Sequence, residues 1–254
     1  MLIPNAPTLN DTLRQALLTG QILDVQVGLT RTAVLAETND GLRCGLAATL
    51  TNPDVDHHTQ PAVREAGRLH KMSSADLAGL IESPSFSEVA IGLAAINALL
   101  PRSPDQWTDL NAGDYLAQHG ANQNVVVVGH FPFIDELRPV VKKLWVLELN
   151  PRPGDYPASS APEIIPQADL LAITATTLIN RSFQGLLALC RPTTRVVLIG
   201  PSAPLSPLLY DFGIQIISGT IVTDPRAVIR AVGQGISFKQ MRKQDLVRLV
   251  TIQK

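Results

Sequence analysis

The sequence predicts an α/β protein built as a small α+β domain with an antiparallel meander, followed by a Rossmann-like domain with a mostly parallel sheet. Two observations predict this. Three runs rich in Val, Leu and Thr follow one another between 22 and 46 with short turns, as in a meander. From 124 onward, short apolar runs alternate with helical stretches, as in a parallel sheet covered by helices on both faces.

The first part is expected to contain a helix, the meander and further helices. Asn10 or Asp11 is expected to cap the first helix. The expected strands are 22–29, 32–37 and 42–46. Ser85-x-x-Glu88 resembles a capping box that opens an apolar helix ending at Pro101. The polar, Pro-rich segment after Pro101 is the expected linker, which gives domains of 1–112 and 113–254.

The second part is expected to hold five strands. These are 125–129, 144–148, 170–174, 196–200 and 214–218. In a 3-2-1-4-5 strand order, the order reverses between the first and fourth strands, and ligands bind beyond the carboxyl ends there. The loops after the first and fourth strands are therefore the expected ligand-binding loops. They begin at Gly129 and Gly200.

Composition narrows the function classes. Hydrophobic residues make up 45% and charged residues 17% of 254 residues, and the formal net charge is −1, so a nucleic-acid partner is not expected. Neither a secretory leader nor an apolar run of bilayer length is evident. A cytoplasmic protein without membrane partners is therefore expected. Cys44 and Cys190 are too far apart in the sequence for a disulfide framework or a metal knuckle.

The two nominated loops supply candidate ligand-binding residues. A glycine at the end of a strand lets backbone approach a ligand, although Gly and Pro also simply make turns. A GxGxxG motif does not follow Gly129, which argues against NAD and FAD. The candidates are Gly129, Phe131, Pro132, Gly200, Pro201 and Ser202.

Acid–base candidates follow the first two strands. Glu148 ends the second strand nineteen residues after Gly129, where Rossmann-like proteins often place an acid that accepts hydrogen bonds from ribose hydroxyls. An exposed strand-end charge is the alternative. His130 is a candidate proton carrier because imidazole titrates near neutrality. Three prolines stiffen the segment 150–157, which is expected to hold Asp155 and Tyr156 over the same cleft.

Polar residues in two apolar helices complete the candidates. Thr174 and Thr177 follow the third strand, where helix capping explains a hydroxyl equally well. Asn180 is a poor helix former unless it faces solvent or a ligand. Asn97 interrupts AIGLAAINALL and, if it is buried, needs hydrogen-bond partners; anchoring a neighbouring loop is the preferred interpretation.

A native metal site is not expected. Asp54, Asp56, His57 and His58 have metal-binding side chains, but they stand side by side without a second, separated group of ligands. Motifs of nucleophilic or zinc peptidases are also missing from the sequence.

Six segments together resemble the putative heavy-metal chelation family over nearly the whole chain. They are GLAATL, EVAIGLAAINALL, VVVVGHFPF, LWVLELNPRPGDYP, ADLLAITATTLIN and VVLIGPSAPLSPLLYDFGI. The resemblance implies an enolase N-terminal-like domain followed by a Rossmann-like one, with a ligand cleft between them. Its motif positions in this chain are Asn97, Gly129, Phe131, Pro132, Glu148, Asp155, Pro157, Thr174, Thr177, Asn180, Gly200, Pro201 and Ser202.

The leading hypothesis is a small-molecule enzyme that condenses or hydrolyses a pterin-, flavin- or siderophore-like compound, with a link to metal chelation implied by the resemblance. Glu148 and His130 are its expected catalytic groups. A non-catalytic carrier of a metal–chelator complex is the competing class. A protein that binds S-adenosylmethionine or a nucleoside is the third. A small-molecule ligand is the expected partner, its identity and any cofactor are unassigned, and a homodimer stays open.

Overall fold

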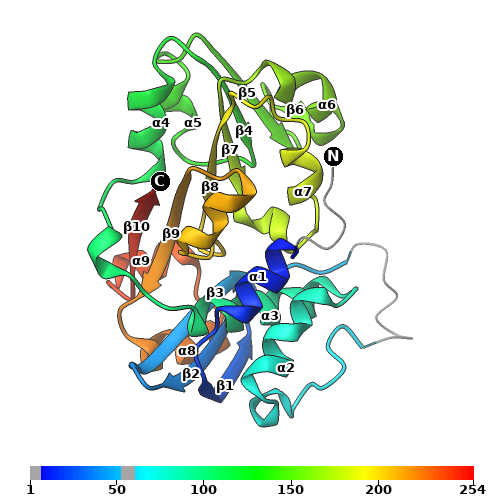
Figure 1. Cartoon of the computed structure of the whole chain (residues 1–254), viewed down its shortest axis with the longest axis vertical. Coiled ribbons are helices and arrows are strands. Elements are labelled where there is room, and N and C mark those ends of the chain that lie inside the picture. The colour runs from blue at the N-terminus through cyan, green and yellow to red at the C-terminus, as the bar shows by residue number, and fades with distance from the viewer. Residues whose placement is uncertain (1–6, 53–60) are drawn as a thin grey trace.

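A computed structural model describes residues 7–52 and 61–254 and contains two sheets (Figure 1). The smaller sheet is antiparallel, in the order β1-β2-β3. The larger has the order β10-β9-β8-β7-β4-β5-β6 and is parallel except for the β9–β10 pair. The predicted fold class, with an antiparallel meander and a mostly parallel sheet, is confirmed.

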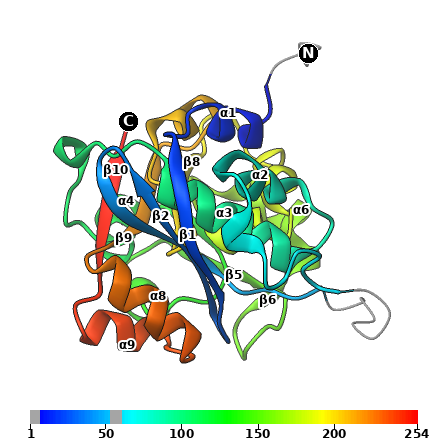
Figure 2. The ribbon, with the colours of Figure 1, turned by 90° about the horizontal axis from the view of Figure 1, so that it is seen from below.

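The meander is packed between helices on both faces. Its strands are β1 (Gly20–Val27), β2 (Arg31–Thr38) and β3 (Gly41–Ala48). Val34 and Ala36 join the core formed with α3 (Phe86–Leu99), whereas Ala33 and Leu35 face α8 (Pro225–Gly233). Side chains alternate between the two faces of a strand, so a strand covered on both faces is apolar throughout. Figure 2 shows α8 and α9 (Phe238–Lys243) beside this sheet.

The parallel sheet is also covered on both faces. Its principal strands are β4 (Asn124–Val128), β5 (Lys143–Glu148), β7 (Leu170–Thr174), β8 (Arg195–Ile199) and β9 (Ile216–Val222). The helices α4 (Ala112–Gly120) and α5 (Ile134–Leu137) pack on one face. On the other face lie α6 (Ala161–Ile164), α7 (Phe183–Leu187) and the core shared with α3.

Two further α-helices and two edge strands lie outside these groups. They are α1 (Leu9–Gln15), α2 (Ser74–Gly79), β6 (Tyr156–Pro157) and β10 (Val247–Gln253). The first helix is capped by Thr8, with Asp11 as the third residue of a reciprocal capping box, so the expected cap at Asn10 or Asp11 is wrong by two or three positions. The edge strand β10 was missed by the sequence analysis.

The strand order corrects the expected topology. In chain order the five principal strands run 2-1-3-4-5 across the sheet, not 3-2-1-4-5. The order therefore reverses between β4 and β7, the first and third strands. Gly129 and Gly200 do emerge at the same end of the sheet, because β4 and β8 both run parallel to β7. They are not adjacent, however, since β7 lies between their strands.

The start of α3 is also different from the expected capping box. The hydroxyl of Ser85 donates to the carbonyl of Ala62, and the N–H of Phe86 donates to Asn52 Oδ1 at 2.7 Å. Glu88 is 2% exposed and accepts hydrogen bonds from Ser83 and from Arg64, whose guanidinium lies 2.7 Å from Glu88 Oε2. The helix is thus capped from another segment, and its acidic residue is buried.

The charge on Glu88 is expected to make stability fall in acid. Burial raises the pKa of this carboxyl, but the hydrogen bonds from Arg64 and Ser83, together with the charge of Arg64, outweigh burial and lower the pKa below its ordinary value. A lowered pKa stabilises the fold above the unfolded-state value, and the stabilisation is lost as pH falls through the folded-state value. We expect Glu88→Gln to reduce the free energy of unfolding near neutrality by about 1–3 kcal/mol, and to flatten its acid dependence. Urea melts across this pH range measure both effects, with the exposed Glu136→Gln as control; equal acid dependence in all three proteins would contradict the assignment.

Close packing of β3 on α3 requires a glycine at 45. A Cβ there would stand 2.1 Å from the carbonyl oxygen of Ala94 and 2.3 Å from the N of Ala98. We expect Gly45→Ala to lower the free energy of unfolding by about 1–3 kcal/mol or more, because the backbone of α3 would have to move to make room for the methyl group. Gly185→Ala is the control. Its Cβ would meet nothing within 4 Å, and alanine in a helix should stabilise by up to about 1 kcal/mol. Equal melting temperatures for the two variants would refute the packing argument.

Candidate functional site

A large cavity opens at the carboxyl ends of β4, β5 and β7. Its volume of about 860 Å³ suits a small molecule, since such sites span roughly 300–1,000 Å³. Seven predicted residues line it: Gly129, His130, Phe131, Glu148, Thr174, Thr177 and Asn180. The first part of the chain contributes Leu50, Thr51, Asn52 and Phe86 to its wall.

The cavity lies where the strand order reverses. Gly129 has φ +99°, and a Cβ there would stand 3.1 Å from the side chain of Thr174. A glycine is therefore needed for two reasons, a left-handed backbone and a close approach between the loops after β4 and β7. The N–H of Gly129 still donates to Leu147 at 2.9 Å, so the loop leaves the sheet only beyond this residue.

Glu148 holds the first two loops together. One carboxylate oxygen accepts the N–H of His130 at 2.9 Å, and the other accepts the N–H of Leu149 at 2.8 Å. A carboxylate can accept about four hydrogen bonds. Glu148 therefore orders the loops and keeps the capacity to bind a ligand in the cavity that it lines.

His130 forms a pair with a buried carboxylate. Its Nδ1 lies 2.9 Å from Asp155 Oδ2, and the Asp155 side chain is 1% exposed whereas that of His130 is 22% exposed. The same oxygen accepts the N–H of Arg152 at 3.1 Å. Because a carboxylate only accepts, the hydrogen bond places a proton on Nδ1. Nε2 is then the ring nitrogen left for a ligand.

The wall after β7 is polar. Thr174 caps a 3-10 turn, Ala175–Leu178, and the Thr177 hydroxyl donates to the Thr174 carbonyl at 2.6 Å. Asn180 Oδ1 accepts the N–H and hydroxyl of Ser182, so its NH₂ group is the part that can serve a ligand. Arg181 has φ +63° and donates from its guanidinium to the carbonyls of Glu82 and Ser83, which ties this wall to the first part of the chain.

Several predicted residues lie elsewhere. Pro132 and Tyr156 are exposed outside the cavity lining, and Asp155 lies behind His130. Asn97, Gly200, Pro201 and Ser202 are away from the lining. Asn97 instead donates to Leu46 and Ser202 carbonyls at 2.8 and 3.2 Å, so it anchors the loop after β8. The nomination of that loop followed from the incorrect strand order.

The resemblance implies a cleft between the two parts of the chain, but sequence reasoning did not identify the residues that the first part contributes to it. Asn52 and Phe86 line the cavity and contact each other through the cap of α3. The signal available in the sequence is the polar segment that follows Thr49. Residues Asp54, Asp56, His57 and His58 lie outside the described residues.

Thiolate chemistry is not supported in the described structure. Burial raises the pKa of the Cys44 thiol to about 12, and burial also raises the pKa of Cys190. Both sulfurs are therefore protonated near neutrality. Within 7–52 and 61–254, three or more His, Cys, Asp or Glu side chains do not gather as metal ligands. In the same ranges, the helices are all too short or too polar to cross a bilayer.

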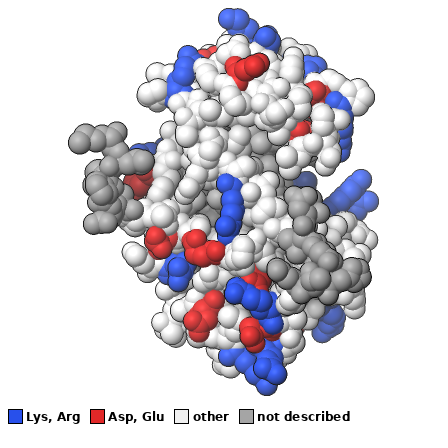
Figure 3. All heavy atoms as spheres, turned by 90° about the vertical axis from the view of Figure 1, so that its right-hand side faces the viewer, with Lys and Arg blue, Asp and Glu red and all other residues white. Residues whose placement is uncertain are grey.

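Charges on the surface are mixed. On the face shown in Figure 3, acidic and basic side chains are interspersed over the lower half and again around the top, with an uncharged region below the top. This distribution fits a net charge of −1.

Comparison with known proteins places the chain among uncharacterised relatives. Models of two families, both described as putative heavy-metal chelation, match residues 111–251 and 10–100. An uncharacterized protein of Methanocaldococcus jannaschii is 24% identical over 211 residues, 80% of each chain. A crystal structure of a family protein of unknown function from Desulfitobacterium hafniense aligns over 97% of this chain and 98% of its own, with 25% identity and a TM-score of 0.74. One from Pyrococcus horikoshii aligns over 96% and 98%, with 20% identity and a TM-score of 0.81, and shares the fold.

The contact with Asp155 predicts the tautomer of His130. We expect the neutral imidazole to carry its proton on Nδ1, because the hydrogen bond of one ring nitrogen fixes the tautomer. Nitrogen-15 NMR of the ring at alkaline pH distinguishes the two tautomers. Asp155→Asn should alter the ratio of the two His130 tautomers. The exposed His70 serves as an internal reference in the same spectrum. A proton on Nε2 of His130 in the unaltered protein would rule out the proposed orientation.

Proposed function

The chain belongs to the putative heavy-metal chelation family, and we propose that it is a small-molecule enzyme whose cleft binds a polar heterocycle and moves a proton on it through His130. The pairing of His130 with the buried Asp155 at the cavity wall carries this proposal. A histidine oriented by a carboxylate is the arrangement that general acid–base catalysis uses. We infer from the reversal of strand order that the ligand enters beside it.

The lining favours a neutral or cationic ligand. Glu148 brings a negative charge, and Lys and Arg do not occur among the described lining residues. A phosphate group would therefore meet a carboxylate without a compensating cation, and like charges repel strongly in a partly buried site. A pterin, flavin or nucleoside without phosphate has the N–H and hydroxyl groups that suit Glu148.

The apolar part of the lining suits a flat ring system. Phe86, Phe131, Leu147 and Leu186 supply apolar area, while Thr174 and Asn180 supply polar groups at one wall. Ligand sites generally combine mostly apolar lining with a few polar groups that fix orientation. The ring would lie against the apolar side chains, and its polar edge would face the strand ends.

The chain's own groups account for a condensation or hydrolysis. Nε2 of His130 would take the proton of an attacking hydroxyl, amine or water and return it to the leaving group. Asp155 would hold the ring in place and stabilise the imidazolium that forms between these steps. Glu148 would fix the ligand and, through the N–H of His130, the backbone of the catalytic residue.

A carrier of a metal–chelator complex is the second candidate. The described residues do not gather a metal-ligand group, so in this version the metal would be held by the chelator and the protein would hold the chelator. The acidic lining suits a cationic complex. A protein that binds S-adenosylmethionine, which is also a cation, is the third candidate.

Metabolite extract separates these functions. The extract is incubated with the protein, and the bound compound is then released. If the protein is an enzyme, the released compound is altered; if it is a carrier, the compound is returned intact. We expect His130→Gln to retain the unaltered compound and to slow its conversion by about 10²- to 10⁴-fold. The exposed His70→Gln is the control and should behave as the unaltered protein. Mass spectrometry of the bound and released fractions makes the measurement.

Two results would oppose the proposal. Intact return of the same compound by the unaltered protein and by His130→Gln would leave the carrier as the function. Retention of phosphorylated compounds in preference to their unphosphorylated counterparts would contradict the charge argument.

A further inference from the structure

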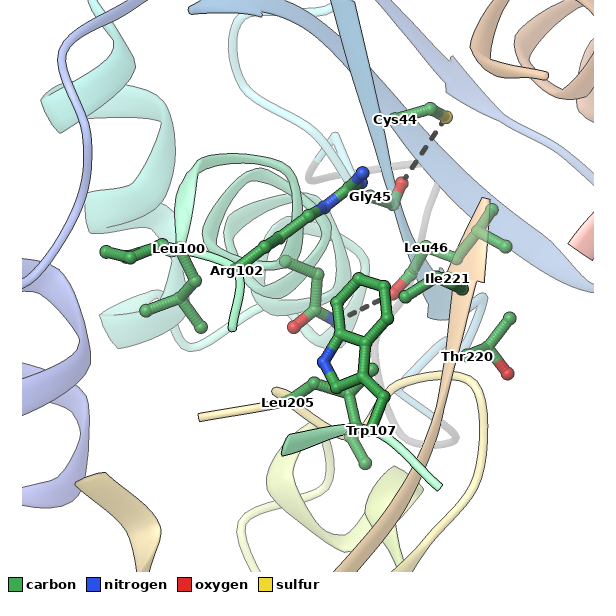
Figure 4. Close-up of a pocket in the computed structure, with 12 residues that line it drawn as sticks. Cys44, Gly45, Leu46, Leu100, Arg102, Trp107, Leu205, Thr220 and Ile221 are labelled. Atoms are coloured by element: carbon green, nitrogen blue, oxygen red, sulfur yellow. Dashed lines mark hydrogen bonds between the residues drawn. The ribbon is translucent and has the colours of Figure 1, made fainter. Parts of the chain in front are cut away.

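A second, smaller pocket lies where the first sheet, the end of α3 and β9 meet (Figure 4). Its lining comes from β3, from the residues that follow α3, and from the loop after β8. The volume is about 30 Å³, enough for about two water molecules or for one ion of similar size. The pocket shares none of its lining residues with the cleft.

A guanidinium without a carboxylate partner faces this pocket. Arg102 makes neither an ion pair nor a hydrogen bond within the part of the chain that the structure describes, and it is partly buried. The neighbouring Asp40 is engaged by Arg43 at 2.7 Å, and Arg43 also donates to the Leu100 carbonyl. Burial, and then the charge of Arg43, lower the pKa of Arg102. The pocket therefore has an excess of positive charge.

Further polar groups of the pocket lack partners. Thr220 Oγ1 and Asn97 Oδ1 are both buried without a hydrogen bond among the described residues. The indole of Trp107 borders the same space beside Arg102, as Figure 4 shows, and it brings an N–H donor. Buried polar groups normally find partners, so this combination indicates that something polar fills the pocket.

The orientation of Asn97 is fixed. Its NH₂ group donates to the carbonyls of Leu46 and Ser202, which leaves Oδ1 as an acceptor that needs a donor. Arg102 and Trp107 bring N–H donors that have no acceptor among the described residues, and the Thr220 hydroxyl can donate or accept. A group that accepts from Arg102 and donates to Asn97 Oδ1 would satisfy both.

We propose that this pocket binds a small planar oxyanion that carries a hydroxyl group, the class of bicarbonate. Two of its oxygens would receive the guanidinium of Arg102 in the paired geometry that carboxylate-like groups make with arginine. Its hydroxyl would donate to Asn97 Oδ1, and its charge would offset that of Arg102, since Arg43 is already paired with Asp40. This site is independent of the cleft and of the function proposed for it.

Trp107 supplies a local signal for the test. The chain has two tryptophans, so Trp145→Phe leaves Trp107 as the reporter at the pocket. We expect its fluorescence to change and saturate with bicarbonate at constant pH and ionic strength. Acetate, which has no donor for Asn97, should bind about tenfold more weakly, and chloride should give no saturable change.

Arginine variants give the control. In the same background, Arg102→Met should abolish the titration, whereas Arg230→Met, which removes an exposed charge on α8, should leave it unchanged. Thermal melts of the protein with both tryptophans should show stabilisation by bicarbonate that is lost in Arg102→Met.

The contrary outcomes are distinct. No saturable change, a response to chloride equal to that for bicarbonate, or a titration that survives Arg102→Met would overturn the site. Equal affinity for acetate would overturn the role given to Asn97.

Discussion

The reversal of strand order between β4 and β7 is the constraint on which the cleft depends. The chain leaves β4 to form β5 on one side and returns to form β7 on the other. Loops that leave neighbouring parallel strands in opposite directions cannot cover the strand ends, so a crevice stays open there. Gly129 allows the two loops to begin close together, and everything that lines the cavity is arranged around that point.

Two carboxylates and the backbone amides that they bind give the cleft its fixed shape. Glu148 and Asp155 each accept backbone N–H groups, and both contact His130, one at its N–H and the other at its ring. Such supporting contacts hold a reactive group in one geometry. Arg181 ties the wall to the first part of the chain, and within that part Asn52 binds the first turn of α3, so the cavity wall is shared by segments that are distant in sequence.

Helices and strands were predictable where the local sequence pattern decides them. The contacts that each element makes with distant segments were not predictable. Five apolar runs predict five buried strands, but runs of such similar composition fit either strand order, and the order decided which loop joins Gly129 at the cleft. Ser85-x-x-Glu88 matches a capping box, yet Arg64 and Ser83 bind the acid and Asn52 caps the helix. The contact of His130 with Asp155 spans 25 residues, and only the fold brings the two together.

The helix α3 links the two sites, because its first turn lines the cleft at Phe86 and its last turn lines the small pocket at Asn97. Its 14 residues span about 21 Å at 1.5 Å per residue. A ligand at one end can influence the other only if the helix has two arrangements to choose between. Gly45 and Gly92 pack directly on backbone, where even a methyl group would stand 2.1 and 2.3 Å from neighbouring atoms. Packing this close favours a single position for the helix, and therefore two sites that bind independently.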